Sequence, residues 1–193
     1  MNLGPEIKAE RIKNMEDWIK TWEELWPTLK SQYFMLETLQ EYSEVDNPAY
    51  VSFLEGDFDK SKELMAKSIG NYKESYNSLF KKGADFIRVH IVKMPLSSYL
   101  KDFELQSYKI STTYGERILI ADIKEIGEDV NNISDFLLFN GKIAMVHDYD
   151  DKGLLIGGWL VKDKGYCKKL KELSQKLISK SVPLGTFLQE KGI

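Results

Sequence analysis

Hydrophobic and polar positions along this chain follow two periods, one typical of helices and one typical of strands. Apolar residues recur at intervals of three and four over 64–80, which predicts an amphipathic helix ended by Gly83. The β-branched run 86–92 predicts a strand. Because side chains alternate between the faces of a strand, Arg88 and His90 should share one face, opposite three apolar residues.

The remaining elements follow the same two periods. Strands are expected at 33–39, 116–121, 136–139, 143–147 and 154–161, and helices at 5–31, 96–103 and 166–177. Asn140-Gly141 suits a type I′ turn between two of these strands. Strands that first alternate with helices and then follow one another through tight turns predict an α/β fold, a mixed parallel and antiparallel sheet flanked by helices. We therefore expect an N-terminal helical extension over 1–30 and a single α/β domain over 31–193.

The first predicted helix carries three tryptophans, Trp18, Trp22 and Trp26, spaced four apart on one face. Such a face is either an aromatic platform for a partner or a stacked base, or the surface that packs the helix onto the domain. Packing is the more common use, and we favour it.

Composition narrows the function classes. The chain has 193 residues with 27 Lys and Arg against 30 Asp and Glu, a net charge of -3, which argues against a dedicated duplex-DNA binder. We find no signal-peptide pattern and no apolar run of the ~18 residues that a membrane span needs, so we expect a cytoplasmic protein without membrane contact. One cysteine and two histidines argue against a metal site and an internal disulfide, and we expect no cofactor.

Polar residues inside predicted strands are the best candidates for a site. The chain has only three arginines, so Arg88 in a central strand requires an explanation, because burying a guanidinium costs several kcal/mol without a carboxylate partner. Glu37, Glu104 and Glu116 are the candidate partners. Two readings remain open: an anion or substrate pocket at the strand ends, and a structural ion pair.

Two further groups of residues complete the candidate set. His90 and His147 would form an acid–base pair if their strands met, although ordinary hydrogen bonds are the more common role of two separate histidines. Tyr108, which follows the helix predicted over 96–103, joins the candidate ligand-binding set. No residue is assigned a catalytic role.

An acidic cluster, Asp148, Asp150 and Asp151 beside Gly153, resembles the start of a calcium loop. The bidentate glutamate that such a loop requires later is missing, since an apolar run follows. The acidity of a hairpin turn explains the cluster better.

The segments 33–42, 87–105, 115–116 and 135–147 together resemble a bacterial domain family of unknown function, whose members in actinobacteria are often encoded near helix-turn-helix regulators. The resemblance covers about residues 30 to 185. Leu119 stands where the family tends to have an arginine, which weakens an anion pocket on this strand.

More remotely, the order of elements is similar to one half of a phospholipase D-like fold. Its signature is His-x-Lys-x-x-x-x-Asp. Aligning Asn140 with the aspartate puts Asp135 at the lysine and Ile133 at the histidine. Because isoleucine cannot replace a nucleophilic histidine, this resemblance implies a domain that has lost that catalysis.

Two functional hypotheses follow. The first is a non-catalytic regulatory or interaction module that binds a small anionic ligand or a protein partner through Glu37, Arg88, Glu104 and Glu116; a homodimer is compatible with it. The alternative is a phosphoester or nucleic-acid hydrolase that uses His90 or His147 with a carboxylate.

Overall fold

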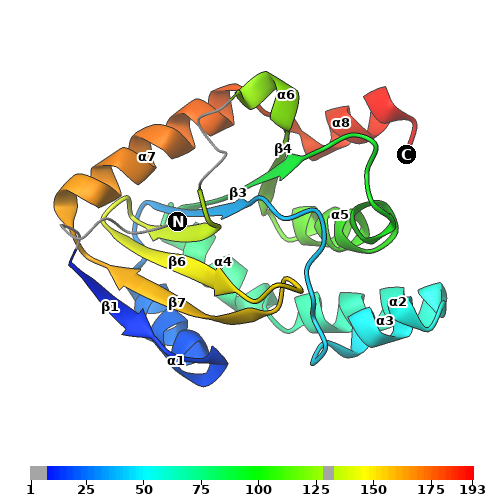
Figure 1. Cartoon of the computed structure of the whole chain (residues 1–193), viewed down its shortest axis with the longest axis horizontal. Helices are drawn as coiled ribbons and strands as arrows, with labels where there is room; N and C mark the ends of the chain where they lie inside the picture. The colour runs from blue at the N-terminus through cyan, green and yellow to red at the C-terminus, as the bar shows by residue number, and fades with distance from the viewer. Residues whose placement is uncertain (1–7, 128–132) are drawn as a thin grey trace.

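The computed structural model describes residues 8–127 and 133–193, and its centre is an eight-stranded sheet (Figure 1). The strands lie in the order β1-β7-β6-β5-β2-β3-β4-β8. Their bounds are β1 Ala9–Ile12, β2 Gln32–Glu37, β3 Asp85–Val92, β4 Arg117–Asp122, β5 Phe136–Phe139, β6 Ile143–Tyr149, β7 Leu155–Val161 and β8 Val182–Pro183.

Parallel and antiparallel strands meet in this sheet. β3 runs parallel to both β2 and β4. The pairs β2 with β5, β5 with β6 and β6 with β7 are antiparallel. Parallel neighbours need long crossover connections, which helices supply, whereas β5, β6 and β7 follow one another through short turns. The mixed sheet flanked by helices is therefore confirmed.

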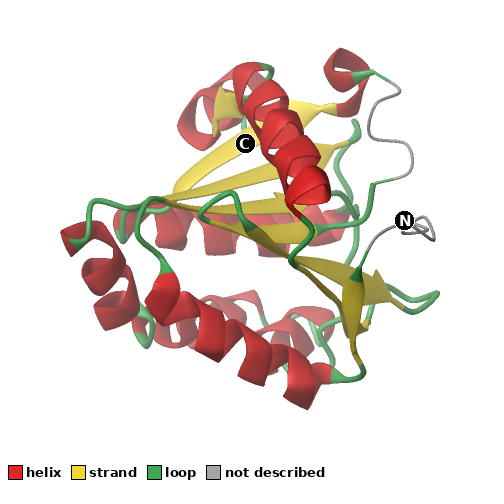
Figure 2. Ribbon diagram, turned by 90° about the vertical axis from the view of Figure 1, so that its left-hand side faces the viewer, coloured by secondary structure: helices red, strands yellow, loops and turns green. Residues whose placement is uncertain are grey.

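Helices cover both faces of the sheet (Figure 2). The long helix α7 lies on one side, and α1 to α5 lie on the other. The bounds are α1 Met15–Leu25, α2 Pro48–Leu54, α3 Phe58–Gly70, α4 Lys73–Lys81, α5 Leu105–Thr113, α6 Ile123–Ile126, α7 Lys164–Ser179 and α8 Leu184–Lys191, with a 3-10 turn η1 Trp26–Thr28 and a π-helical turn η2 Tyr99–Glu104.

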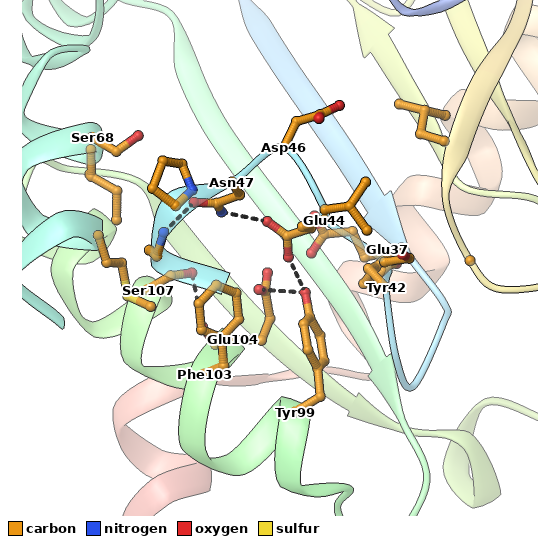
Figure 3. Close-up of a pocket in the computed structure, with 18 of the residues that line it drawn as sticks. Glu37, Tyr42, Glu44, Asp46, Asn47, Ser68, Tyr99, Phe103, Glu104 and Ser107 are labelled. Atoms are coloured by element: carbon orange, nitrogen blue, oxygen red, sulfur yellow. Dashed lines mark hydrogen bonds between the residues drawn. The ribbon is translucent and has the colours of Figure 1, made fainter. Parts of the chain in front are cut away.

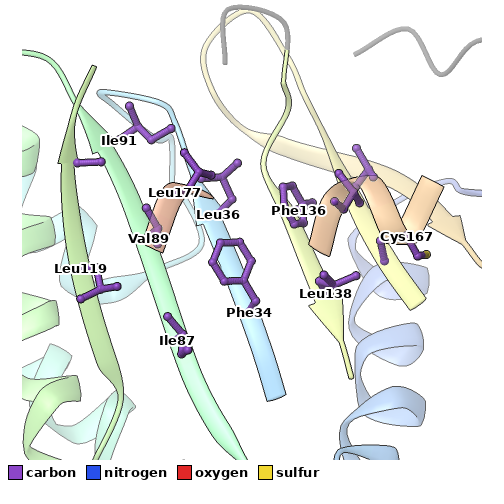
Figure 4. Close-up of a cluster of buried hydrophobic side chains, with 14 of the residues drawn as sticks. Phe34, Leu36, Ile87, Val89, Ile91, Leu119, Phe136, Leu138, Cys167 and Leu177 are labelled. Carbon is purple, nitrogen blue, oxygen red and sulfur yellow. The ribbon is translucent and has the colours of Figure 1, made fainter. Parts of the chain in front are cut away.

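The two faces of β3 differ in chemistry, as the alternation along this strand predicts. Ile87, Val89 and Ile91 point toward α7 and are buried in a cluster of purely apolar side chains (Figure 4). Arg88 and His90 point to the opposite face, toward α5. The apolar face packs the sheet against α7, and the opposite face carries the polar side chains of β3.

The hairpin between β5 and β6 forms as predicted. Asn140 and Gly141 both have positive φ, 53° and 67°, as a type I′ turn requires. The Asn140 carboxamide oxygen accepts hydrogen bonds from the backbone N–H groups of Lys30 and Ser31 at 2.8 and 3.1 Å. The turn therefore also anchors the entry into β2.

The N-terminal region differs from the expected helical extension. Residues 9–12 form the edge strand β1, which pairs with β7, and the helix begins only at Met15. A four-residue edge strand in which only Ile12 is buried has too little alternation to be seen in the sequence. Residues 1–7 lie outside the described residues.

The tryptophan face packs against the domain, as we favoured. The indole N–H of Trp22 donates to the Tyr33 hydroxyl at 3.1 Å, and the Trp22 and Trp26 rings lie 4.8 Å apart between centroids. Trp26 also contacts Phe86 edge to face. Helix α1 is therefore an integral part of this side of the sheet.

Several helices differ from the sequence prediction. The helix expected over 64–80 is two helices, α3 and α4, separated at Asn71 and Tyr72. Gly70 and Asn71 have low helix propensity, which explains the break within a continuous apolar stripe. The helix expected over 96–103 begins at Tyr99 and continues to Thr113, as η2 followed by α5. The short helices α2, α6 and α8 were not expected, because eight residues or fewer carry little periodicity.

Candidate functional site

Polar side chains gather where β2 ends, on the face of the sheet opposite α7. Glu37 is the last residue of β2 and lies beside His90 of β3 in the parallel register. Asp135 directly precedes β5, the other neighbour of β2, and its backbone carbonyl accepts a hydrogen bond from the N–H of His147 on β6. In open α/β sheets the carboxyl ends of parallel strands are the usual place for a ligand.

Arg88 is held by carboxylates on three sides. Its Nε lies 2.6 Å from Glu116 Oε1 and its Nη1 lies 2.7 Å from Glu37 Oε1. Glu104 Oε1 lies 3.9 Å from the same Nη1, and the guanidinium stacks over the Tyr108 ring at 5.0 Å. All three candidate partners thus surround Arg88. Two of its three nitrogens are engaged, so the geometry favours an ion-pair network over an anion pocket.

A hydrogen-bonded chain runs from the sheet to Glu37. His90 Nε2 lies 2.9 Å from the Leu39 carbonyl oxygen, His90 Nδ1 lies 2.7 Å from the Tyr108 hydroxyl, and this hydroxyl also bonds Glu37 Oε2. The Tyr108 hydroxyl therefore links the buried His90 imidazole to the Glu37 carboxylate, which Arg88 contacts from its other side.

A second pair of carboxylates shares a tyrosine (Figure 3). The Tyr99 hydroxyl lies 2.6 Å from Glu44 Oε1 and 3.0 Å from Glu104 Oε2. One phenolic hydrogen cannot serve both contacts, so one carboxyl must be protonated. Burial, together with the charges of Glu37 and Glu44, raises the pKa of Glu104 to about 8, which places that proton on Glu104 at neutral pH.

Asp135 is a buried centre that sequence reasoning missed as a site residue. Its oxygens accept from the Thr38 backbone N–H at 2.8 Å, from the Thr38 hydroxyl at 2.6 Å and from the hydroxyls of Tyr42 and Tyr149 at 2.5 and 3.0 Å. Burial raises the pKa of Asp135 to about 6, against the opposing effect of these donors. The sequence signal that points to Asp135 is its position immediately before a fully apolar strand.

The two histidines do not form a pair. β6, β5, β2 and β3 are consecutive in the sheet, so His147 and His90 lie three strand spacings apart, about 14 Å. His147 Nδ1 bonds the Tyr149 hydroxyl at 2.9 Å and its ring meets Trp18 edge to face. Burial lowers the pKa of His147 to about 4 and also lowers that of His90. Both imidazoles serve as internal hydrogen-bonding groups.

A pocket of about 650 Å³ opens over this face, between the sheet, η2, α2, α3 and the β6–β7 turn (Figure 3). Four of its lining side chains are acidic and one is basic, and six are aromatic. The charged residues are Glu37, Glu44, Asp46, Arg88 and Glu104, and the aromatic ones are Tyr42, Tyr72, Tyr76, Tyr99, Phe103 and Tyr149. Of the seven sequence candidates, Glu37, Arg88 and Glu104 line this pocket, whereas Tyr108, Glu116 and both histidines are not part of its lining.

The acidic hairpin has a structural explanation. Asp148 pairs with Arg11 at 2.7 Å, and the Asp150 carboxylate accepts from the backbone N–H groups of Lys152 and Leu154. The Asp150 bonds close the β6–β7 turn, and the Asp148 pair joins β6 to β1. Within residues 8–127 and 133–193, no group of three or more His, Cys, Asp or Glu side chains is placed to hold a metal ion.

The three residues that align with the phospholipase D signature point to different surroundings. Ile133 packs against the apolar cluster under α7. Asp135 lies in the hydrogen-bonded centre described above, and Asn140 holds the turn at the far end of β5. The three side chains do not converge on one site.

Comparison with solved structures identifies the class of fold. The phospholipase D family member Nuc from Salmonella typhimurium matches with a TM-score of 0.52 at 6% identity, over 92% of this chain and 98% of Nuc. NucT from Helicobacter pylori matches with a TM-score of 0.48 at 10% identity, over 92% and 99%. TrmBL2, an archaeal chromatin protein, gives 0.48 at 9%, over 93% of this chain and 55% of TrmBL2. The architecture is phospholipase D-like.

The amino-acid sequence assigns the chain to a protein family. Residues 20–189 match the family described as "Domain of unknown function (DUF6879)", and the chain belongs to it. No curated protein sequence matches the chain. In the part of the chain that the structure describes, no helix has the length and apolarity to cross a membrane.

Proposed function

We propose that this chain is a non-catalytic ligand-binding module, with its ligand seated in the pocket at the carboxyl end of β2. The observation that supports this most is the buried charge network: Arg88, Glu37 and Glu104 keep 15%, 14% and 10% of their side chains exposed, and all three line the cavity. Buried charges that remain open to a cavity of this size are typical of a binding site.

A phosphoester or nucleic-acid hydrolase is the alternative, and the geometry supports it less. His90 is fully buried with both ring nitrogens bonded inside the protein. His147 bonds Tyr149 and lies outside the pocket lining. A general base must reach its substrate within hydrogen-bond distance, and neither imidazole does so from these positions.

We further propose that the bound ligand regulates the contact between this chain and a partner protein. Binding of a ligand beside α2 and α3 would change the surface that these helices present to another protein. A helix-turn-helix regulator is the partner that the family resemblance suggests, and a cytoplasmic location and a homodimer belong to the same proposal. Co-purification of the tagged full chain with a co-expressed regulator, with and without ligand, tests this part.

Thermal-shift measurements on the full chain test the binding role. A panel of organic cations, phosphorylated metabolites and nucleotides should contain at least one compound that raises the Tm by about 2 °C or more. Ser68 is exposed and lines the pocket, so Ser68→Trp should fill the mouth and abolish the shift, whereas Ser68→Ala should retain it. Hydrolysis of bis(p-nitrophenyl) phosphate that is lost in His90→Gln or His147→Gln would instead establish the hydrolase.

A further inference from the structure

We propose that the pocket binds a small organic cation, a compound with an ammonium group seated between Glu44, Glu104 and Glu37. This inference rests on the proposed function, since it names the ligand class of the same pocket. It replaces the anionic ligand expected from Arg88 in the sequence.

The charges of the pocket do not balance without such a ligand. Among the described residues that line the pocket, Arg88 is the one basic side chain, and it already contacts two carboxylates, Glu116 and Glu37. The pair Glu44 and Glu104 shares one proton through Tyr99, so this pair adds a negative charge that no basic side chain of the lining balances. An isolated charge in a partly buried site is costly, and a cation would remove that cost.

The geometry places acceptors toward the cavity. Glu44 and Glu104 approach the Tyr99 hydroxyl from two sides (Figure 3), and Glu37 lines the same pocket. Carboxylate and phenol oxygens accept hydrogen bonds, and an ammonium group has only donors to offer. An anion would find one free nitrogen, Arg88 Nη2, with three carboxylates around the same guanidinium.

The aromatic walls indicate an organic cation. The Tyr42 ring lies 6.1 Å from that of Tyr99 and 5.7 Å from that of Tyr149 between centroids, and Phe103 stands 5.5 Å from Tyr99. Aromatic faces attract ammonium groups and accommodate the apolar carbon atoms attached to them. A cavity of about 650 Å³ also exceeds the space that a bare ion needs and suits a small molecule.

Isothermal titration calorimetry of the full chain tests the inference, with putrescine, agmatine and choline as cationic probes and inorganic phosphate and AMP as anionic ones. We expect at least one cationic probe to bind and both anions to give no heat of binding. Glu44→Gln should weaken that binding by about tenfold or more, since it removes a charged acceptor.

Glu41→Gln is the matched control. Glu41 is exposed, lies three residues from Glu44 and is not part of the pocket lining, so this substitution changes the net charge equally and should leave the affinity unchanged. Circular dichroism of both variants confirms that each is folded. Equal weakening by the two variants, or none by either, would overturn the inference by showing attraction outside the pocket.

The remaining outcomes separate this inference from the proposed function. Binding of phosphate or AMP that Ser68→Trp abolishes, without binding of any cationic probe, refutes the cationic ligand and leaves the binding module in place. If neither these probes nor the wider thermal-shift panel binds, the proposed function fails together with the inference.

Discussion

Glu104→Gln isolates the carboxyl group that the fold keeps protonated. The pKa of Glu104 is raised from 4.5 to about 8, mainly by burial. A raised pKa means that the folded protein binds a proton which the unfolded chain releases above pH 4.5, so stability falls as the pH rises from about 4.5 to 8. Glutamine keeps the shape and a hydrogen donor for Tyr99 but carries no titrating proton.

The size of the Glu104 pKa shift determines how strongly the free energy of unfolding should depend on pH. Each pKa unit corresponds to about 1.4 kcal/mol, so this group alone should lower the wild-type free energy of unfolding by about 3 kcal/mol between pH 5 and pH 8. Glu104→Gln should show no such loss. The variant should therefore match the wild type within about 1 kcal/mol at pH 5 and exceed it by about 3 kcal/mol at pH 8.

Urea unfolding monitored by tryptophan fluorescence at pH 5, 6.5 and 8 measures this difference. Glu41→Gln, the exposed counterpart, should follow the wild type across the range. If the wild type were more stable than Glu104→Gln at pH 8, Glu104 would be an ionised partner of Arg88 at 3.9 Å. In that case the assignment of the shared proton would be wrong.

Three further substitutions test the framework of the site in urea unfolding. Asp135→Asn replaces an oxygen that accepts two hydroxyls by an amide donor and should cost about 2 to 4 kcal/mol; an unchanged midpoint would contradict its central role. Asn140→Ala loses a turn acceptor at positive φ and should cost about 1 to 3 kcal/mol, with Asn140→Gly less harmful. Gly158→Ala puts a Cβ 2.1 Å from the Val146 carbonyl oxygen and should cost about 3 kcal/mol or prevent folding; a stable variant would refute the close approach.

Local patterns in the sequence predicted much of the framework. Period two on β3 separated Ile87, Val89 and Ile91 from Arg88 and His90, and the structure places these groups on opposite faces. The Asn140-Gly141 turn followed from its φ requirements alone. These features depend on residues close in the chain, where period and turn chemistry determine the structure.

Contacts between distant segments were the part that the sequence could not supply. Arg88 pairs with Glu37 and Glu116, 51 and 28 residues away, and the sequence offered these acids only as candidates. Asp135 meets Thr38 and Tyr42 across more than 90 residues, with no motif to connect them. The sign of the pocket charge therefore emerged only when the carboxylates were placed together in three dimensions.

The number of protons released on binding tests the central claim most directly. Calorimetric titration of the full chain with its best cationic probe, at pH 7.5 in HEPES and in Tris, gives this number from the difference in observed enthalpy. A bound ammonium group replaces the proton on Glu104, whose pKa of about 8 keeps it largely protonated at this pH, so we expect release of roughly half a proton or more per ligand and tighter binding as the pH rises. The opposite result would be proton uptake, or an affinity for the cation that falls as the pH rises. Either would contradict the claim that the pocket is negatively charged and that the proton on Glu104 takes the place of the cation.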